Sequence, residues 1–153
     1  MIPLQIIVQN EVGVRYRVNL VDNAEKTQYE SIEQLEYLRN NGYICNEYTC
    51  SYVASKGRLD LLKYLRKNNC PWNEYTCSWA AENGHLDVLK WARENGCPWD
   101  ERTCSYAASK GRLNILKYAR ENGCPWDKWT YEYAKRSRRK DVLEWLRDNN
   151  CLM

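Results

Sequence analysis

The amino-acid sequence repeats itself with a fixed period of 27 residues. The cysteines that mark the period are Cys70, Cys97, Cys124 and Cys151. Each of the first three begins a Cys-Pro-Trp motif that is followed by Asn or Asp. A period of this size predicts stacked supersecondary units, each of which buries its apolar faces against its neighbours. Such a stack offers a surface for holding other molecules rather than a pocket for chemistry.

The period divides the chain into a non-repeating segment, a half unit and four repeats. Residues 1–31 do not repeat, and residues 32–42 match the second half of a repeat. The repeats span residues 43–69, 70–96, 97–123 and 124–150. The chain of 153 residues has the length of one domain. We therefore expect an N-terminal segment at 1–31 joined to a solenoid at 32–153.

Each repeat predicts two short helices joined by a glycine turn. Residues that favour helix N-caps recur at one position (Asn46, Asn73, Asp100 and Asp127). In the second repeat, Cys77, Ala80 and Ala81 form an apolar face at helical spacing, and Gly84 ends the first helix. These small residues allow the first helices to approach closely, while leucine and aromatic side chains of the second helices fill the space between repeats. The predicted fold class is an all-α repeat solenoid.

Residues 80–89, Ala-Ala-Glu-Asn-Gly-His-Leu-Asp-Val-Leu, resemble the inner helix, the Gly-His turn and the outer-helix start of an ankyrin repeat. The resemblance covers roughly residues 32–153. The family's period is about 33 residues, so the shortening falls in the connection where ankyrin repeats carry a β-hairpin finger. The shorter Cys-Pro-Trp type is similar to repeats of giant DNA viruses and some protists. The resemblance implies a protein-binding scaffold without catalytic activity.

Residues 1–31 predict a β-hairpin followed by a connector. Residues 4–8 and 14–20 are rich in β-branched side chains, with a turn at 9–13 between them. Ser31 and Gln34 predict a capping box at the start of the next helix. Because an isolated hairpin is marginally stable in water, we expect it to cover the apolar side of that helix. Alternatively, its edge binds a partner strand or a second copy of the chain, which would produce a homo-oligomer.

Seven of the eight cysteines occupy two repeated positions. Equivalent positions of stacked helices lie about 8–10 Å apart, beyond the roughly 7 Å that a disulfide spans between Cα atoms. We therefore expect reduced, buried thiols, with a Cys70–Cys77 bond as the alternative. There is no C-x-x-C pair and His85 is the only histidine, so we expect no structural zinc and no other cofactor.

Basic residues gather in the degenerate fourth repeat (Lys135, Arg136, Arg138, Arg139 and Lys140). The net charge of the whole chain is only +3, so the excess of positive charge comes from this cluster and not from the rest of the chain. A solvated polar cap at the end of the stack accounts for this cluster. The alternatives are a nuclear-import signal and a patch for an acidic partner. Nucleic acid is a less favoured partner, because the rest of the chain has no basic stripe or known reader motif.

The ankyrin resemblance implies a binding surface along the concave face of the stack. Two sets of positions there vary between repeats while their neighbours stay constant. The first set lies early in the first helix (Tyr48, Tyr75, Arg102 and Trp129), and the second precedes the glycine turn (Ser55, Lys56, Glu82, Asn83, Ser109, Lys110 and Arg136). Such variation marks positions that are free of the shared packing role, and Tyr, Trp and Arg commonly anchor interfaces. The alternative is that these side chains simply face solvent.

The repetition argues against a unique active site, because a nucleophile needs a base and an orienting group beside it. No small-molecule substrate is expected. No apolar run is long enough to cross a membrane and no signal peptide is evident. These features predict a cytoplasmic protein, in the host cytoplasm if the chain is viral, with a nuclear location as the alternative.

The sequence as a whole therefore predicts a non-catalytic protein–protein interaction scaffold that binds a partner through its concave face. Two alternative functions remain open. One is a structural or assembly subunit that docks into a larger complex or oligomer. The other is a nucleic-acid-associated adaptor that uses the basic residues at 135–140.

Overall fold

Start and stop signals in each repeat produce a pair of helices. The computed structural model describes residues 5–9, 15–19, 30–42 and 45–151. Within these residues the helices are α1 (Ile32–Asn40), α2 (Glu47–Ser55), α3 (Leu59–Lys67), α4 (Glu74–Asn83), α5 (Leu86–Glu94), α6 (Glu101–Ser109), α7 (Leu113–Glu121), α8 (Lys128–Arg136) and α9 (Lys140–Asp148). The predicted N-caps are confirmed, because each of these side chains accepts a backbone N–H from its own helix (Asn46, Asn73, Asp100 and Asp127).

The N-terminal segment contains two strands, β1 (Gln5–Gln9) and β2 (Arg15–Asn19). They pair antiparallel, with Gln5 opposite Asn19 and Gln9 opposite Arg15. Residues 10–14 and 20–29 lie outside the described residues. The hairpin as a complete unit, its cap role and its edge contacts therefore stay predictions.

The first helix after this segment begins with a variant of the predicted capping box. The Ser31 Oγ atom accepts a hydrogen bond from the Gln34 backbone N–H at 3.2 Å. The Gln34 side chain accepts from the backbone N–H of Glu30, at 2.8 Å, rather than from that of Ser31. Both residues therefore cap α1, but the returning hydrogen bond lies one residue earlier than the sequence pattern indicated.

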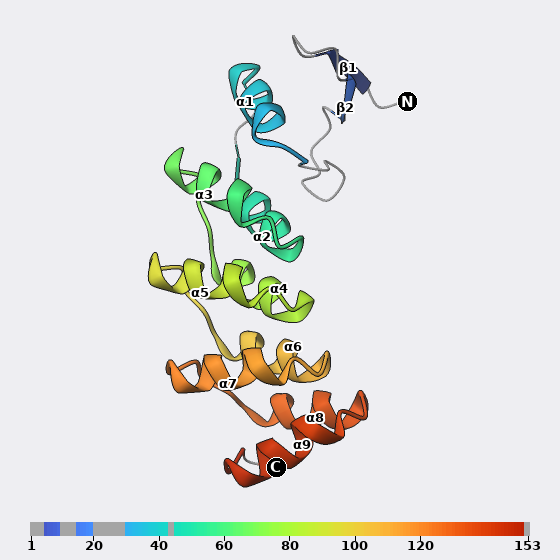
Figure 1. Cartoon of the computed structure of the whole chain (residues 1–153), viewed down its shortest axis with the longest axis vertical. Helices are drawn as coiled ribbons and strands as arrows, with labels where there is room; N and C mark the ends of the chain where they lie inside the picture. Colours follow the sequence, from blue (N-terminus) through green and yellow to red (C-terminus); the bar gives the residue numbers. More distant parts are fainter. Residues whose placement is uncertain (1–4, 10–14, 20–29, 43–44, 152–153) are drawn as a thin grey trace.

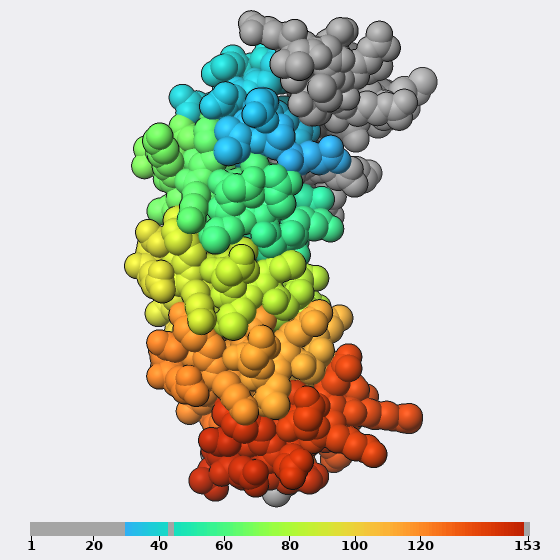
Figure 2. Space-filling model, viewed as in Figure 1, coloured from blue at the N-terminus to red at the C-terminus, as the bar shows by residue number. Residues whose placement is uncertain are grey.

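The helix pairs stack into a bowed column, with α2, α4, α6 and α8 on its inner side (Figure 1). These first helices pack directly on one another, because fully buried small residues such as Cys77, Ala80 and Ala81 face the neighbouring repeat. The second helices α3, α5 and α7 stand further apart, since larger side chains such as Leu61 and Leu62 fill their interfaces. This difference in spacing bends the stack, and Figure 2 shows its continuous surface.

An arginine–tryptophan contact joins each second helix to the following repeat. The guanidinium of Arg120 lies 4.0 Å from the ring centroid of Trp126, and its Nη1 donates to the Cys124 carbonyl oxygen at 2.6 Å. The same two contacts recur one and two repeats earlier (Arg66 with Trp72 and Cys70; Arg93 with Trp99 and Cys97). These connections contain neither helix nor strand, so each is a short loop.

The turn between the two helices of a repeat is covered by the next repeat. Gly57 has φ of +69°, and a Cβ atom at this position would lie 2.5 Å from the His85 ring. The His85 Nε2 atom lies 3.0 Å from the Ser55 carbonyl oxygen. In the fourth repeat Arg138 replaces this glycine and also has a positive φ, of 54°. Glycine is therefore required only where a following repeat presses against the turn.

One expectation about the cysteines is wrong. Cys70 forms a disulfide with Cys45, and their Cα atoms lie 5.6 Å apart. Cys45 occupies the position that holds tryptophan in the other repeats, so the spacing between equivalent positions does not apply to this pair. The alternative Cys70–Cys77 bond is absent, because Cys77 is a free thiol. The six remaining cysteines are free and buried, as expected (Cys50, Cys77, Cys97, Cys104, Cys124 and Cys151).

Candidate functional site

The predicted binding residues belong to the first helices, which line the inner side of the column, or directly follow them. At the position early in each helix, Tyr48 on α2 is 51% exposed and Trp129 on α8 is 43% exposed. They are the two large exposed hydrophobic side chains among the residues whose burial the structure describes. Tyr75 and Arg102, which hold the same position on α4 and α6, are half-buried. This row therefore has an exposed aromatic residue at each end.

Aromatic residues one turn later extend the row along each helix. The ring centroids of Tyr75 and Trp79 lie 5.9 Å apart, and those of Trp129 and Tyr133 lie 5.8 Å apart. Residues four positions apart face the same side of a helix, so these pairs form ridges across the stack. The second residues of these pairs, and Tyr106 at the same position of α6, are half-buried.

Arg102 links two neighbouring repeats instead of standing free. Its Nη2 atom lies 2.6 Å from Asp100 Oδ2 and 2.9 Å from Glu74 Oε1. Its guanidinium also lies 4.3 Å from the ring centroid of Tyr75. The hydrogen bond to Asp100 raises the pKa of Arg102 further above its ordinary value. Arg102 thus joins α4 to α6, and the acidic residues that hold it were missed because the sequence shows them only as helix-capping and first-turn residues.

The positions before the glycine turns form a second, polar row. Ser55 and Ser109 donate their hydroxyl groups to backbone carbonyls of their own helices, at 2.7 and 2.9 Å. Lys110 Nζ lies 3.4 Å from Glu82 Oε1 in the neighbouring repeat. Three exposed side chains belong to the same row (Lys56, Asn83 and Arg136). The first helices and the residues that follow them therefore carry exposed aromatic side chains together with charged and polar groups of mixed sign.

The basic cluster surrounds the turn between α8 and α9. Its five residues are exposed (Lys135, Arg136, Arg138, Arg139 and Lys140). Arg139 packs against the preceding repeat, where its Nε donates to the Ser109 carbonyl oxygen at 3.4 Å and its side chain covers Gly111. Arg139 therefore covers the turn of the preceding repeat, as His85 covers Gly57, whereas the other four present their charges to solvent.

Three buried thiols, those of Cys50, Cys77 and Cys104, lack the properties of nucleophiles. Burial raises the pKa of Cys50 to about 12. A hydrogen bond with Cys97, together with burial, raises the pKa of Cys77, and Cys124 has the same effect on Cys104. Because the thiolate is the reactive form, these thiols are protonated and unreactive at neutral pH.

Neither a metal-binding cluster nor a membrane-spanning helix is found among the described residues. No group of three or more His, Cys, Asp or Glu side chains in this part of the chain is placed to hold a metal ion. Over the same residues, no helix has the length and apolar character needed to cross a membrane.

Comparison with protein families places an ankyrin signature in the middle of the stack. A family model described as ankyrin repeats (many copies) matches residues 77–120, which extend from α4 to α7. The helix-pair stack of the described residues is consistent with that match. No curated protein matches the chain.

Proposed function

We propose that this protein is a non-catalytic protein–protein interaction scaffold that holds a partner along the concave face of its stack. Ankyrin repeats generally act as protein-interaction modules, and the family match covers the central repeats. The observation that supports the proposal is the exposure of Tyr48 and Trp129, at 51% and 43%, on helices α2 and α8.

The energetic case rests on these two aromatic side chains. Burial of a large apolar side chain contributes about 1.5–3 kcal/mol, and aromatic residues commonly form the hot spots of interfaces. The adjacent polar row supplies charges of both signs, including Lys56, Glu82 and Arg136. Such charges favour one partner over another more than they increase affinity. The aromatic residues therefore anchor the partner, and the polar row selects it.

The test uses Tyr48→Ala with Trp129→Ala, because neither side chain is buried in the stack. Affinity purification from the native host, with mass spectrometry, identifies captured proteins, and titration of a purified partner measures its affinity. We expect the double variant to weaken binding at least about tenfold while the far-UV circular dichroism and the urea midpoint stay unchanged. A control variant, Lys117→Ala, removes an exposed side chain from α7 and should bind normally. Equal binding by both variants would exclude this surface.

A nucleic-acid adaptor is the second candidate function. The observation in its favour is the exposure of four cations close together at one end of the stack (Lys135, Arg136, Arg138 and Lys140). Phosphate contacts make binding strongly dependent on salt. Salt-sensitive retention on nucleic acid that disappears when these residues become glutamine would support the adaptor. Retention that is unchanged in the glutamine variant would exclude it.

A test of residues 1–31 separates the scaffold from an assembly subunit. If these residues join copies of the chain, deletion of residues 1–30 lowers the molecular mass measured in solution, in a concentration-dependent manner. A scaffold role predicts an unchanged mass.

We propose a cytoplasmic location, and a fluorescent fusion in the native host tests it directly.

A further inference from the structure

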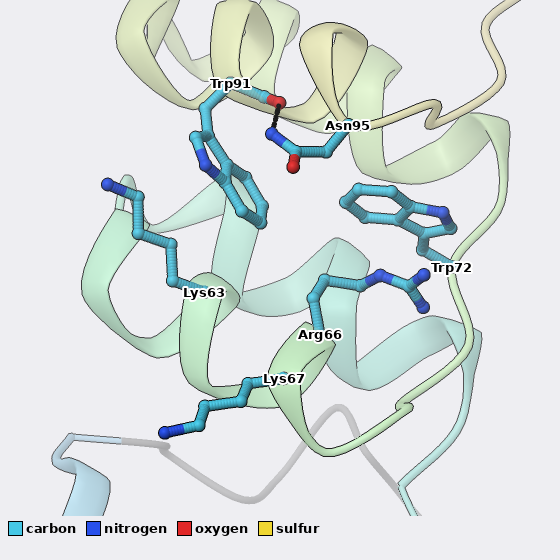
Figure 3. Close-up of a pocket in the computed structure, with 6 residues that line it drawn as sticks. All are labelled: Lys63, Arg66, Lys67, Trp72, Trp91 and Asn95. Atoms are coloured by element: carbon cyan, nitrogen blue, oxygen red, sulfur yellow. Dashed lines mark hydrogen bonds between the residues drawn. The ribbon is translucent and has the colours of Figure 1, made fainter.

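A recess lies between the second helices of the first two repeats, on the outer side of the stack. Its lining comes from α3, from the loop before α4, and from α5 and the residue after it (Lys63, Arg66, Lys67, Trp72, Trp91 and Asn95). Its volume is about 350 Å³ and it is open to solvent on one side. Figure 3 shows Trp72 and Trp91 on either side of the recess, with Arg66 beside Trp72, Lys63 beside Trp91 and Lys67 further from the two indoles.

Two indoles and a guanidinium pack together at the floor of the recess. The ring centroids of Trp72 and Trp91 lie 5.9 Å apart in an edge-on arrangement. Arg66 lies 4.1 Å from the Trp72 centroid and donates one N–H to the Cys70 carbonyl oxygen. A guanidinium carries five N–H donors, so Arg66 retains donors for a ligand. Lys63 Nζ lies 5.9 Å from the Trp91 centroid, which places a second cation at the rim.

The charge of this recess differs from that of its counterparts. Three cations line it, and no carboxylate does. The later repeats carry acidic residues where the first repeat has Lys67 (Glu94, Glu121 and Asp148). The arginine–tryptophan contact joins the second helix to the following repeat at three junctions, whichever residue follows the arginine. Packing of these junctions therefore does not explain why Lys67 is a lysine.

We propose that this recess is a binding site for an acidic segment of a partner protein, in which carboxylates pair with Lys63, Arg66 and Lys67 and a neighbouring apolar side chain packs against the two indoles. The open wall favours a segment over a free small molecule, because small-molecule sites bury most of their ligand. The carboxylate-free lining matches an acidic chain by charge. The site lies on the outer side of the stack and is independent of the proposed concave surface.

The experiment measures fluorescence anisotropy of a short labelled peptide of Glu, Asp and Leu with the full chain. A peptide with Gln and Asn in place of Glu and Asp is the neutral control. The test variant is Lys63→Gln with Lys67→Gln, and the matched control variant is Lys90→Gln with Lys117→Gln, which removes two charges from later repeats. A gain variant, Glu94→Lys, gives the second junction the same set of cations as the first.

We expect the acidic peptide to bind and the neutral one not to bind. The test variant should lose about tenfold or more in affinity, since two partly screened charge contacts disappear, and the control variant should lose little. Glu94→Lys should raise the number of bound peptides per chain. The Tyr48→Ala, Trp129→Ala variant should bind the peptide normally, which separates this site from the concave surface.

Three results would overturn the inference. The first is equal loss in the test and control variants, which would show a general attraction to positive charge. The second is no binding of the acidic peptide to the unmodified chain. The third is displacement of the peptide by inorganic phosphate or by a short polyuridine at lower concentration than by unlabelled peptide, which would show a phosphate site instead.

Discussion

Two positions in every regular repeat take a positive φ, but only one of them excludes a side chain. Gly57 lies under His85 of the next repeat. Gly96, at the end of a second helix, has φ of +81°, and a Cβ atom added there would have no neighbour within 4 Å. Asparagine occupies the position equivalent to Gly96 in the first and fourth repeats (Asn69 and Asn150). The local backbone therefore permits asparagine, and the neighbouring repeat decides where glycine is required.

Substitution by asparagine separates these two effects. We expect Gly96→Asn to change the free energy of unfolding by less than about 0.5 kcal/mol, because asparagine tolerates a positive φ. Gly57→Asn should cost about 2 kcal/mol or more, since the His85 ring must move as well. Urea unfolding followed by circular dichroism measures both. Equal costs at the two positions would contradict the role assigned to His85.

The buried thiol of Cys50 predicts a loss of stability at alkaline pH. Burial raises the pKa of Cys50 to about 12 in the folded chain, whereas the pKa of a thiol in the unfolded chain is about 8.5. Its contribution is fully present below the unfolded pKa and is lost as pH rises through the folded pKa. From pH 7.5 to 9.5, we expect the free energy of unfolding to fall by about 1 kcal/mol on account of this thiol.

Urea unfolding at the two pH values tests this prediction. The Cys50→Ala variant is the control and should show a shallower decline between the same pH values. A decline of the same size in the variant would mean that other groups cause it.

At the scale of elements, the junction between a second helix and the following repeat depends on one arginine. Arg120 stacks on Trp126 and also donates to the Cys124 carbonyl oxygen. Trp126 in turn lies 5.9 Å from Trp145 on α9, between ring centroids. The contact therefore connects α7, the loop that follows it and α9.

Truncation of this arginine tests the junction. We expect Arg120→Ala to lower the free energy of unfolding by about 1–2 kcal/mol, from loss of the stacking contact and the hydrogen bond. Arg120→Lys should recover only part of that, because lysine lacks the planar group that performs both roles. Lys117→Ala on the same helix is the control and should have little effect. A control loss as large as that of Arg120→Ala would refute the role of this contact.

At the scale of the whole molecule, stability is distributed along the stack rather than concentrated at one centre. Each repeat contacts mainly its immediate neighbours, so a local change should have local consequences. The disulfide between Cys45 and Cys70 acts at one end of this column. It joins the start of the first repeat to the start of the second, across α2 and α3.

Removal of the disulfide should loosen one end of the stack. The bond closes a loop with a sequence separation of 25, for which the chain-entropy model gives about 3 kcal/mol. We expect Cys45→Ser to accelerate amide hydrogen exchange in α2 and α3 and to leave exchange in α6 to α8 unchanged. Hydrogen exchange with mass spectrometry resolves the two regions, and treatment with a reductant should reproduce the effect. Uniform acceleration along the chain would argue against a stack of locally coupled repeats.

The sequence alone determined the helix pairs and their caps, because these depend on residues only a few positions apart, such as Asn73 at the start of α4 and Gly84 at its end. It also determined that the first helices pack closely, since small side chains recur with the period. Only the tertiary structure decided which variable positions remain exposed, as Tyr48 does, and which become links, as Arg102 does.

The tertiary structure likewise decided the partner of Cys70 and the cationic recess beside Trp72 and Trp91. These features depend on contacts between different positions of neighbouring repeats. Comparison of equivalent positions along the sequence cannot reveal such contacts, because the offset between stacked repeats is a property of how their surfaces pack in space.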